Sequence, residues 1–243
     1  FPEPQVIAEG ASVPAASIAE EWETYAVQER ARLVTLSRRA IINDDLRAFQ
    51  RVTQAAALGC YTALRRRVFG ILTANGTLRD GTAIFAVGRG NLGTAGALGA
   101  AQIRQLFQLH LQQTSPSRGP DAASAPLPPP NQVALLVPPE EAVTAAELTG
   151  PLIQPTAAGA ALPSEYRQMI EVIPEGFLAT GNNPYYMARK DMRAMEIAYL
   201  RGRRTPTVTS AETIEHTGVT FRVLFDFEAA VVNPRLIAAN LNV

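Results

Sequence analysis

The sequence predicts a fold of the α+β class, and three observations indicate this. An apolar series spaced by three or four residues predicts one long amphipathic helix over residues 44–72. Stretches rich in Thr, Val, Leu, Ile and Tyr lie before that helix at residues 22–42, and further strand-like stretches lie at residues 205–232. Helices and strands follow one another in mixed order rather than in strict alternation, which favours α+β.

The N-terminal region is predicted to be extended. Residues 1–20 are rich in Pro, Ala, Glu and Ser and cannot bury enough apolar surface alone, so we expect an arm that is ordered only against a neighbouring molecule. Residues 22–30 and 31–42 are predicted to be the two strands of a long hairpin.

The long helix has a clear start and a clear apolar face. Asn43, Asp44 and Asp45 offer side-chain acceptors at its N-terminus. The apolar positions are Leu46, Phe49, Val52, Ala56, Cys60, Leu64 and Val68. The helix is therefore roughly 40 Å long, about twice the average for globular domains. A long helix next to a two-stranded arm is a frame for reaching neighbouring molecules.

Shorter elements follow the long helix. Residues 73–87 are predicted to form a turn and a short strand at 84–87. After a glycine-rich stretch comes a helix that ends near Gln113, with one face made of Ile103, Leu106, Phe107, His110 and Leu111. Residues 115–131 contain six prolines and are predicted to be a loop.

The second half of the chain is predicted to consist mostly of strands. Residues 133–137 form a buried strand, and the proline and acids of residues 138–141 favour the first turn of a helix. Residues 151–163 are a second loose segment. The remaining strands are predicted at 170–173, 194–200, 205–213 and 219–232, with Tyr185 and Tyr186 before the second of them and a turn at 216–218 before the last.

Composition and charge exclude several classes of protein. With 47% hydrophobic and 18% charged residues among 243, the chain is typical of a globular protein rather than a disordered one. Its formal net charge is zero, so the chain as a whole carries no electrostatic signature for nucleic acid or an anionic membrane. No apolar run approaches the roughly 18 residues of a membrane span. Cys60 is the lone cysteine, so no internal disulfide can form.

The strongest signal for a cofactor is the sequence GRGNLG at Gly88 to Gly93. It matches the G-x-G-x-x-G pattern of a dinucleotide-binding turn and lies between a predicted strand and a predicted helix. The acidic residue expected about 20 positions later is missing, because the first acid after Gly93 is Asp121 in the proline-rich loop. A glycine-rich connection is therefore the favoured interpretation, and no cofactor is predicted.

Other catalytic patterns are weaker, and we predict that the chain is not an enzyme. His110 and His216 are the only histidines; the first lies on an apolar helix face and the second in an apparent turn. One cysteine and two distant histidines do not make a metal site. Asp44 and Asp45 could act as paired carboxylates, but their place before a helix favours capping. No catalytic, cofactor-binding or metal-binding residues are predicted.

Several short motifs, in their order and spacing, resemble the major head subunits of Mu-like tailed phages and prophages. They are residues 22–25, 38–46, 72–75, 80–81, 84–85, 90–92, 135–139, 197–200 and 218–226. The resemblance implies the Hong Kong phage-type capsid fold. It divides the chain into an N-terminal arm (1–21), an E-loop hairpin (22–43), a P-domain (44–114) with a spine helix (44–72), an A-domain (115–203) and C-terminal strands that return to the P-domain (204–243).

The function implied by this resemblance is structural. The chain would self-assemble into pentamers and hexamers that form the icosahedral head around the double-stranded DNA of a tailed phage, with only weak contacts to the DNA and none to a membrane. Portal, scaffold, protease and decoration proteins are the expected partners, the virion is the expected location, and assembly would take place in the bacterial cytoplasm. The alternatives are the shell of an encapsulin-like nanocompartment and, more distantly, a nucleotide-binding enzyme that uses Gly88 to Gly93. The start at Phe1 fits cleavage by a head-maturation protease or a removed leader.

Candidate contacts between subunits are aromatic and arginine side chains, which are strong interface anchors. They are Trp22, Tyr25, Arg30, Arg32, Arg38, Arg39, Arg65, Arg66 and Arg67. Some capsids of the resembled fold join subunits by an isopeptide bond from an E-loop lysine. Lys190 is the only lysine here and lies outside residues 22–42, so we expect a shell without cross-links.

Overall fold

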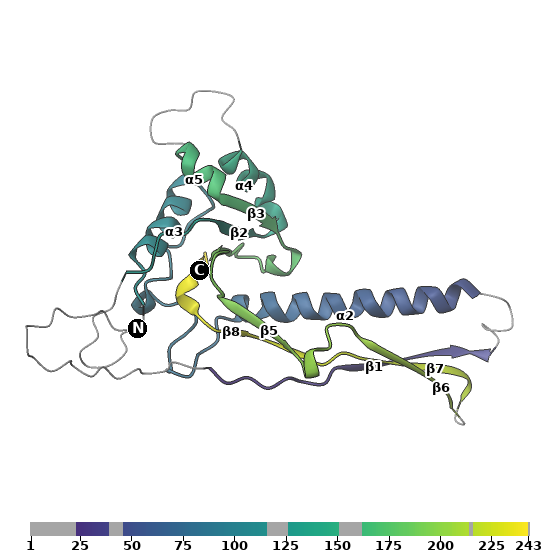
Figure 1. Cartoon of the computed structure of the whole chain (residues 1–243). Coiled ribbons are helices and arrows are strands. Elements are labelled where there is room, and N and C mark those ends of the chain that lie inside the picture. Colours follow the sequence, from purple (N-terminus) through teal and green to yellow (C-terminus); the bar gives the residue numbers. More distant parts are fainter. Residues whose placement is uncertain (1–22, 39–45, 116–125, 151–161, 214–215, 243) are drawn as a thin grey trace, which may run out of the picture. The chain divides into compact units, whose positions relative to one another are not determined.

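The computed structural model describes residues 23–38, 46–115, 126–150, 162–213 and 216–242. It is a mixed structure of helices and sheets, which confirms the α+β class (Figure 1). The chain divides into two compact units. The first unit comprises Phe1–Glu23, Thr73–Ala194 and Val231–Val243, and the second comprises Thr24–Leu72 and Met195–Ala230.

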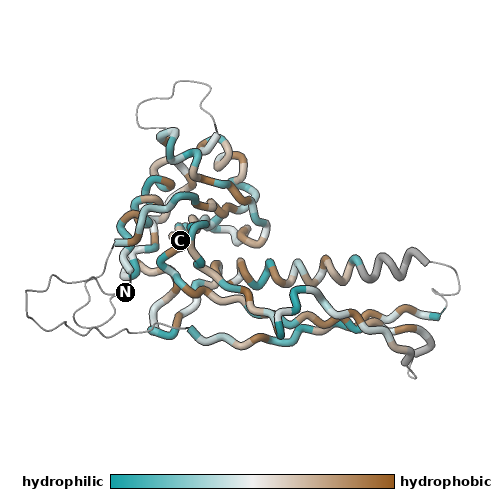
Figure 2. Tube along the Cα trace, viewed as in Figure 1, coloured by the Kyte–Doolittle hydropathy of each residue, from teal (hydrophilic) through white to brown (hydrophobic). Residues whose placement is uncertain are grey.

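The second unit contains the predicted long helix. Helix α2 spans Leu46–Ala74, 29 residues, and Figure 1 shows long strands whose axes lie roughly along the helix axis. Along this helix hydrophobic positions recur between hydrophilic ones (Figure 2), as expected for an amphipathic helix. Asn43, Asp44 and Asp45 lie outside the described residues, so their capping role stays a prediction.

A three-stranded antiparallel sheet accompanies α2. Its order is β1-β7-β6, with β1 at Ala31–Ser37, β7 at His216–Leu224 and β6 at Thr207–Thr213. Ala31 and Thr207 both pair with Leu224, so the outer strands cover the same stretch of β7. A two-stranded sheet of β5 (Met195–Tyr199) and β8 (Phe227–Val231) completes the set.

The predicted hairpin of residues 22–30 and 31–42 is wrong in its described part. Strand β1 pairs with β7, whereas residues 23–30 have a single strand-type bridge, from Gln28 to Phe227. A tight reversal of the chain needs residues such as Gly, Asn, Asp or Pro, and the predicted turn at Arg30 and Ala31 has none of them.

The C-terminal strands also differ from the prediction. The expected strand at 219–232 is two strands, because the chain leaves β7 after Leu224 and begins β8 at Phe227. Between them, the Phe225 N–H donates to the Arg30 carbonyl and the Asp226 carbonyl accepts from the Leu200 N–H. The predicted turn at 216–218 is wrong as well, since β7 already begins at His216.

The first unit is built on a four-stranded sheet of order β3-β2-β4-β9. These strands span Ile170–Pro174, Val133–Val137, Tyr185–Arg189 and Ile237–Asn240 respectively. Strands β2 and β3 are parallel, and the other neighbours are antiparallel. The predicted strands at 133–137, 170–173 and 194–200 are confirmed, whereas β4 was missed because only its tyrosine pair was noted.

Three helices pack with this sheet: α3 (Ala100–Gln112), α4 (Ala142–Thr149) and α5 (Ser164–Met169). A short 3-10 turn at Pro139–Glu141 precedes α4, where proline and acids predicted a helix start. Ile103, Leu106, Phe107 and His110 are buried as predicted and form the face of α3 that joins the core. Leu111 is 43% exposed, so its assignment to that face is wrong.

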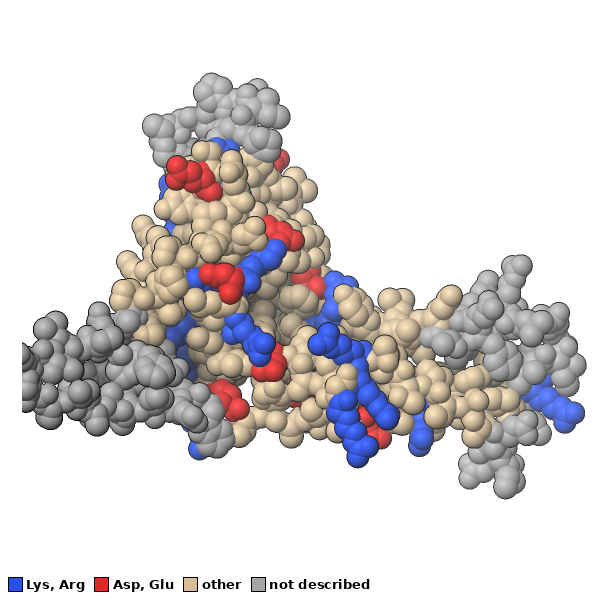
Figure 3. All heavy atoms as spheres, in the orientation of Figure 1, with Lys and Arg blue, Asp and Glu red and all other residues tan. Residues whose placement is uncertain are grey.

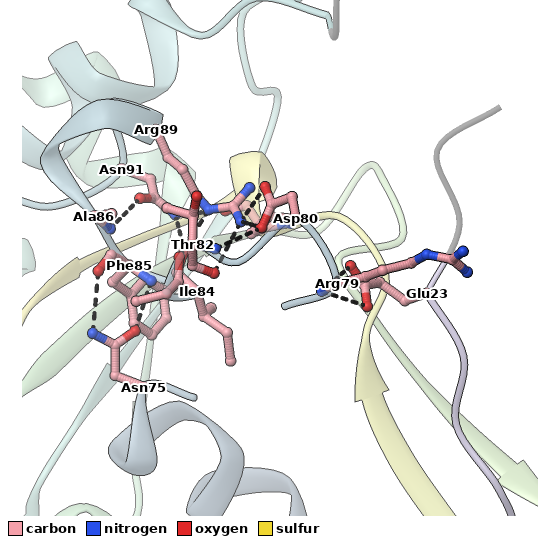
Figure 4. Close-up of polar contacts among 12 residues, drawn as sticks. Glu23, Asn75, Arg79, Asp80, Thr82, Ile84, Phe85, Ala86, Arg89 and Asn91 are labelled. Atoms are coloured by element: carbon pink, nitrogen blue, oxygen red, sulfur yellow. Dashed lines mark hydrogen bonds and ion pairs between the residues drawn. The ribbon is translucent and has the colours of Figure 1, made fainter. Parts of the chain in front are cut away.

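The predicted strand at 84–87 does not form, although Ile84 and Phe85 are buried. Two asparagine side chains take the place of a partner strand (Figure 4). Asn75 accepts from the Phe85 N–H at 2.7 Å and donates to its carbonyl at 3.1 Å. Asn91 donates to the carbonyls of Ile84 and Pro234 and accepts from the Ala86 N–H. The apolar pair is therefore held by side-chain amides rather than by a ladder.

The turn around Asp80, next to this segment, is held by an ion pair between Asp80 and Arg89. Both carboxylate oxygens of Asp80 accept from Arg89 at 2.6 Å, and one also accepts from the Thr82 N–H (Figure 4). These contacts, with the Thr82 N–H the largest, hold the pKa of Asp80 below its ordinary value despite a partial burial that would raise it. Gly81 adopts a left-handed φ of 78°, which favours glycine at this position.

Candidate functional site

The described candidate contact residues all lie in the second unit. Tyr25 and Arg30 lie before β1, Arg32 in it and Arg38 just after it, while Arg65, Arg66 and Arg67 lie on α2. Trp22 and Arg39 lie outside the described residues. The candidates therefore form two groups, one along the extended segment with β1 and one on the long helix.

Arg30 and Arg67 meet at one buried carboxylate. Glu228 of β8 is only 3% exposed. One of its oxygens accepts from Arg30 Nη2 at 3.1 Å, and the other accepts from Arg67 Nε. Arg30 also lies over the Phe227 ring, 4.2 Å from its centroid. Two of the predicted contact residues are thus engaged inside the subunit.

The same cluster decides the charge of Glu228. Burial alone would raise its pKa, but hydrogen bonds from Arg67, the Ala229 N–H and Arg30 outweigh burial and hold the pKa below its ordinary value. Glu228 therefore stays ionised at neutral pH and joins the segment before β1, helix α2 and strand β8.

Most other members of the two groups are open to solvent, and Arg67 keeps 46% of its side chain exposed beside its bond to Glu228. Tyr25 is 37% exposed, and Arg32 and Arg38 are exposed beside Leu33, which is 66% exposed. On α2, Arg66 is exposed, and Arg65 stacks on Tyr61 with 5.8 Å between the guanidinium carbon and the ring centroid. Leu58 and Tyr61 are 66% and 57% exposed. Exposed apolar side chains next to arginines are typical of surfaces that bind another protein.

The sequence analysis missed a basic loop. Arg201, Arg203 and Arg204 are exposed around the 3-10 turn Leu200–Gly202. Arg201 and Gly202 have left-handed φ values of 50° and 71°, and for an arginine this costs conformational energy. The sequence signal for this loop was the presence of three arginines within four positions. Elsewhere on the face shown in Figure 3, acidic and basic side chains are mixed.

The glycine-rich segment at Gly88 to Gly93 is not a dinucleotide-binding turn. The described residues 75–87 directly before it contain no strand; a 3-10 turn at Val87–Arg89 overlaps it, and α3 begins only at Ala100. Its backbone donors are used within the chain, since the Gly90 N–H donates to the Val87 carbonyl at 2.9 Å and the Gly93 N–H to the Ala239 carbonyl at 2.7 Å. Gly90 has a φ of 65°, which explains a glycine there.

The environments of His110 and Cys60 are those of structural rather than reactive side chains. His110 is 1% exposed, and its Nε2 lies 3.0 Å from the Met187 carbonyl oxygen. Burial lowers its pKa to about 4, so the ring is neutral at pH 7. Partial burial raises the pKa of the Cys60 thiol, which disfavours the reactive thiolate. Asp44 and Asp45 lie outside the described residues.

Sites for a ligand are poorly developed in the part of the chain that the structure describes. No group of three His, Cys, Asp or Glu side chains there could hold a metal ion. A depression between α3, α5 and Pro129 has a volume of about 210 Å³. This is below the roughly 300 to 1,000 Å³ of typical small-molecule sites.

Comparison with known proteins decides the class. The sequence pattern of the phage capsid protein family matches residues 20–240. The chain belongs to the phage capsid protein family. This capsid protein is therefore a structural subunit of a viral shell, as predicted. Comparison with curated protein sequences gives no match.

Solved structures confirm the predicted capsid fold at low sequence identity. A chain of Mycobacterium phage Bobi has a TM-score of 0.58 and 13% identity over 98% of this chain and 81% of that one. A chain of Mycobacterium phage Che8 has a TM-score of 0.55 and 15% identity over 98% of this chain and 80% of that one. A chain of the SrpI encapsulin complex of Synechococcus elongatus has a TM-score of 0.52 and 13% identity over 88% of this chain and 73% of that one. The narrower likeness to Mu-like head subunits and the five predicted segment boundaries stay predictions.

Two further observations concern this capsid protein. Lys190, its only lysine, forms an ion pair with Glu171. The helices within the described ranges include none that is long and apolar enough to cross a lipid bilayer.

Proposed function

We propose that this capsid protein assembles into pentamers and hexamers that close an icosahedral head around the double-stranded DNA of a tailed phage. The observation that carries the proposal is the family match over residues 20–240. Head-to-tail contacts that close into rings can tile such a shell, and each contact can be weak because many act together.

Contacts between neighbouring copies would use the exposed candidates first. Tyr25, Arg32, Arg38 and Arg66 are exposed to solvent. Arg65 would add to the same helix face, and Trp22 and Arg39 extend the first group along the sequence. Arg30 and Arg67 would act indirectly, because Glu228 already accepts hydrogen bonds from both.

Contact with the packaged DNA would use the basic loop. Arg201, Arg203 and Arg204 are exposed, and a guanidinium binds phosphate with two parallel hydrogen bonds. With a formal net charge of zero, the chain would bind DNA only weakly, which suits a container.

The remaining roles follow from a structural shell. The protein would perform no catalysis, would assemble in the bacterial cytoplasm and would cooperate with portal, scaffold, protease and decoration proteins. A shell without cross-links is supported by the engagement of Lys190 with Glu171.

The test is to express the protein, separate particles by sedimentation, treat them with nuclease and measure the protected nucleic acid. Fast-sedimenting particles with protected double-stranded DNA are expected when the packaging genes are present. A nanocompartment is the second candidate, favoured by the structural match to the SrpI encapsulin complex. Particles filled with protein would support it, and a discrete monomer or dimer under every condition would contradict both.

A further inference from the structure

The four outermost strands of the two larger sheets differ in how they are protected. An outermost strand offers unpaired N–H and C=O groups, and proteins usually cover it or place Pro, Lys or Arg there. Strand β9 is covered: the Gly93 N–H donates to the Ala239 carbonyl and the Ala239 N–H to the Asn91 carbonyl. Strand β3 ends in Pro174, and β1 contains Arg32.

Strand β6 lacks these protections among the described residues, and its register with β7 shifts only at its end, between Glu212 and Thr213. Its sequence, TVTSAET, has no Pro, Lys or Arg. It pairs with β7 along one side and has no other strand partner among the described residues. Thr207, Thr209 and Ser210 are exposed. Its outer side is therefore the sheet edge best suited to bind another strand.

The β6 strand also fits a second copy of itself. In an antiparallel pair centred on Ser210, Ser210 faces Ser210, Thr209 faces Ala211, and Val208 faces Glu212. The only two charges, one Glu212 from each copy, are four positions apart along the strands, about 13 Å. No like charges are opposite one another, and opposed residues lie on the same face. A two-fold axis normal to the sheet produces this register.

We propose that the β6 edges of two copies pair antiparallel across a two-fold axis at Ser210. The result is a continuous six-stranded sheet of order β1-β7-β6-β6-β7-β1. This inference rests on the proposed function only because a shell brings many copies together. It adds a specific contact that the nine predicted contact residues do not include.

Cysteine cross-linking tests the register. In a Cys60→Ser background, Ser210→Cys places two thiols directly opposite each other, with Cα atoms about 4.5 to 5.5 Å apart, within the range for a disulfide. Val34→Cys is the matched control, since Val34 is the central residue of β1, the other edge of the same sheet. After mild oxidation of purified shells, a disulfide-linked dimer is expected from Ser210→Cys and not from Val34→Cys.

A charge exchange provides a second, independent readout. Ser210→Lys and Ser210→Glu each place like charges opposite each other and should lower the yield of shells severalfold. Co-expression of the two variants should restore the yield, because lysine then faces glutamate. Since Ser210 is exposed, neither variant should change the unfolding midpoint of the isolated subunit.

The outcomes separate this inference from the proposed function. Intact shells that give no Ser210→Cys dimer, or a dimer from Val34→Cys alone, would overturn the β6 pairing and leave the shell function standing. Equal yields for the single charge variants and their mixture would also overturn it. Absence of shells from the unaltered protein would instead count against the proposed function.

Discussion

Arg67 of α2 and Glu228 of β8 form an ion pair although 161 positions separate them in the sequence. Arg30 donates to the other oxygen of the same carboxylate, so three distant parts of the second unit meet at one buried group. We predict that Glu228→Gln lowers the free energy of unfolding of the unassembled subunit by about 1 to 3 kcal/mol, because two arginines lose a charged acceptor. Urea denaturation measures this change.

Glu171→Gln is the matched control for that variant. It removes the acid from the Lys190 ion pair, whose side chains are 42% and 54% exposed. Exposed ion pairs contribute roughly 0 to 1 kcal/mol, so a much smaller change is expected. Equal effects of the two variants would show that the Glu228 cluster has no special role.

Stability should fall at acid pH, with His110 as one cause. Its folded pKa is about 4, below the ordinary 6.5, so the unfolded chain binds a proton first as the pH falls. Its stabilising contribution is complete above pH 6.5 and is lost as the pH falls toward 4, by about 3 kcal/mol. His110→Gln should make the unfolding midpoint less sensitive to pH in this range; an unchanged profile would contradict the assignment.

The low pKa of Glu228 acts in the same direction and at lower pH. A depressed carboxylate pKa stabilises the folded state above the ordinary value and loses this effect as the pH falls through the folded value. The Glu228→Gln variant should therefore lose less stability than the unaltered protein on acidification below the ordinary glutamate range. Urea titrations at a series of pH values give the comparison.

The side chain of Asn91 should be essential for the segment around Ile84. It is fully buried and makes hydrogen bonds to three backbone groups. Asn91→Ala leaves these groups without partners and should cost about 2 to 4 kcal/mol. Asn182→Ala, at an exposed position, is the control and should have little effect. Similar unfolding midpoints for both would contradict the account of this segment.

Loss of the three arginines of the basic loop should lower the retention of DNA more than the yield of shells. The triple change of Arg201, Arg203 and Arg204 to Ala should leave shell yield unchanged and lower the retention of DNA at moderate salt, because phosphate contacts are lost. The amount of protected DNA per particle is the measurement. A loss of shells with normal DNA content in those that form would place these arginines at a subunit interface instead.

Local features of the chain were predictable, and pairings between distant segments were not. The spacing of apolar residues in α2 and the apolar run of β2 are properties of neighbouring residues, so the sequence alone indicates both. The partner of β1 lies more than 180 positions away, and nothing in residues 31–37 specifies it. Such pairings depend on the whole fold.

The contact residues show the same limit. The sequence marks Arg30 and Arg67 as arginines in useful places, but only the structure shows that Glu228 accepts hydrogen bonds from both. Ile84 and Phe85 look like part of a strand because they are apolar, yet the amides of Asn75 and Asn91 bond their backbone. The family was nevertheless predictable, since the order of short motifs survives where each motif alone is weak.

Electron microscopy of purified particles, with analysis of their contents, tests the central claim most directly. The account predicts uniform closed icosahedral shells that contain double-stranded DNA when the packaging genes are co-expressed. A discrete monomer or dimer that persists under those conditions would contradict it.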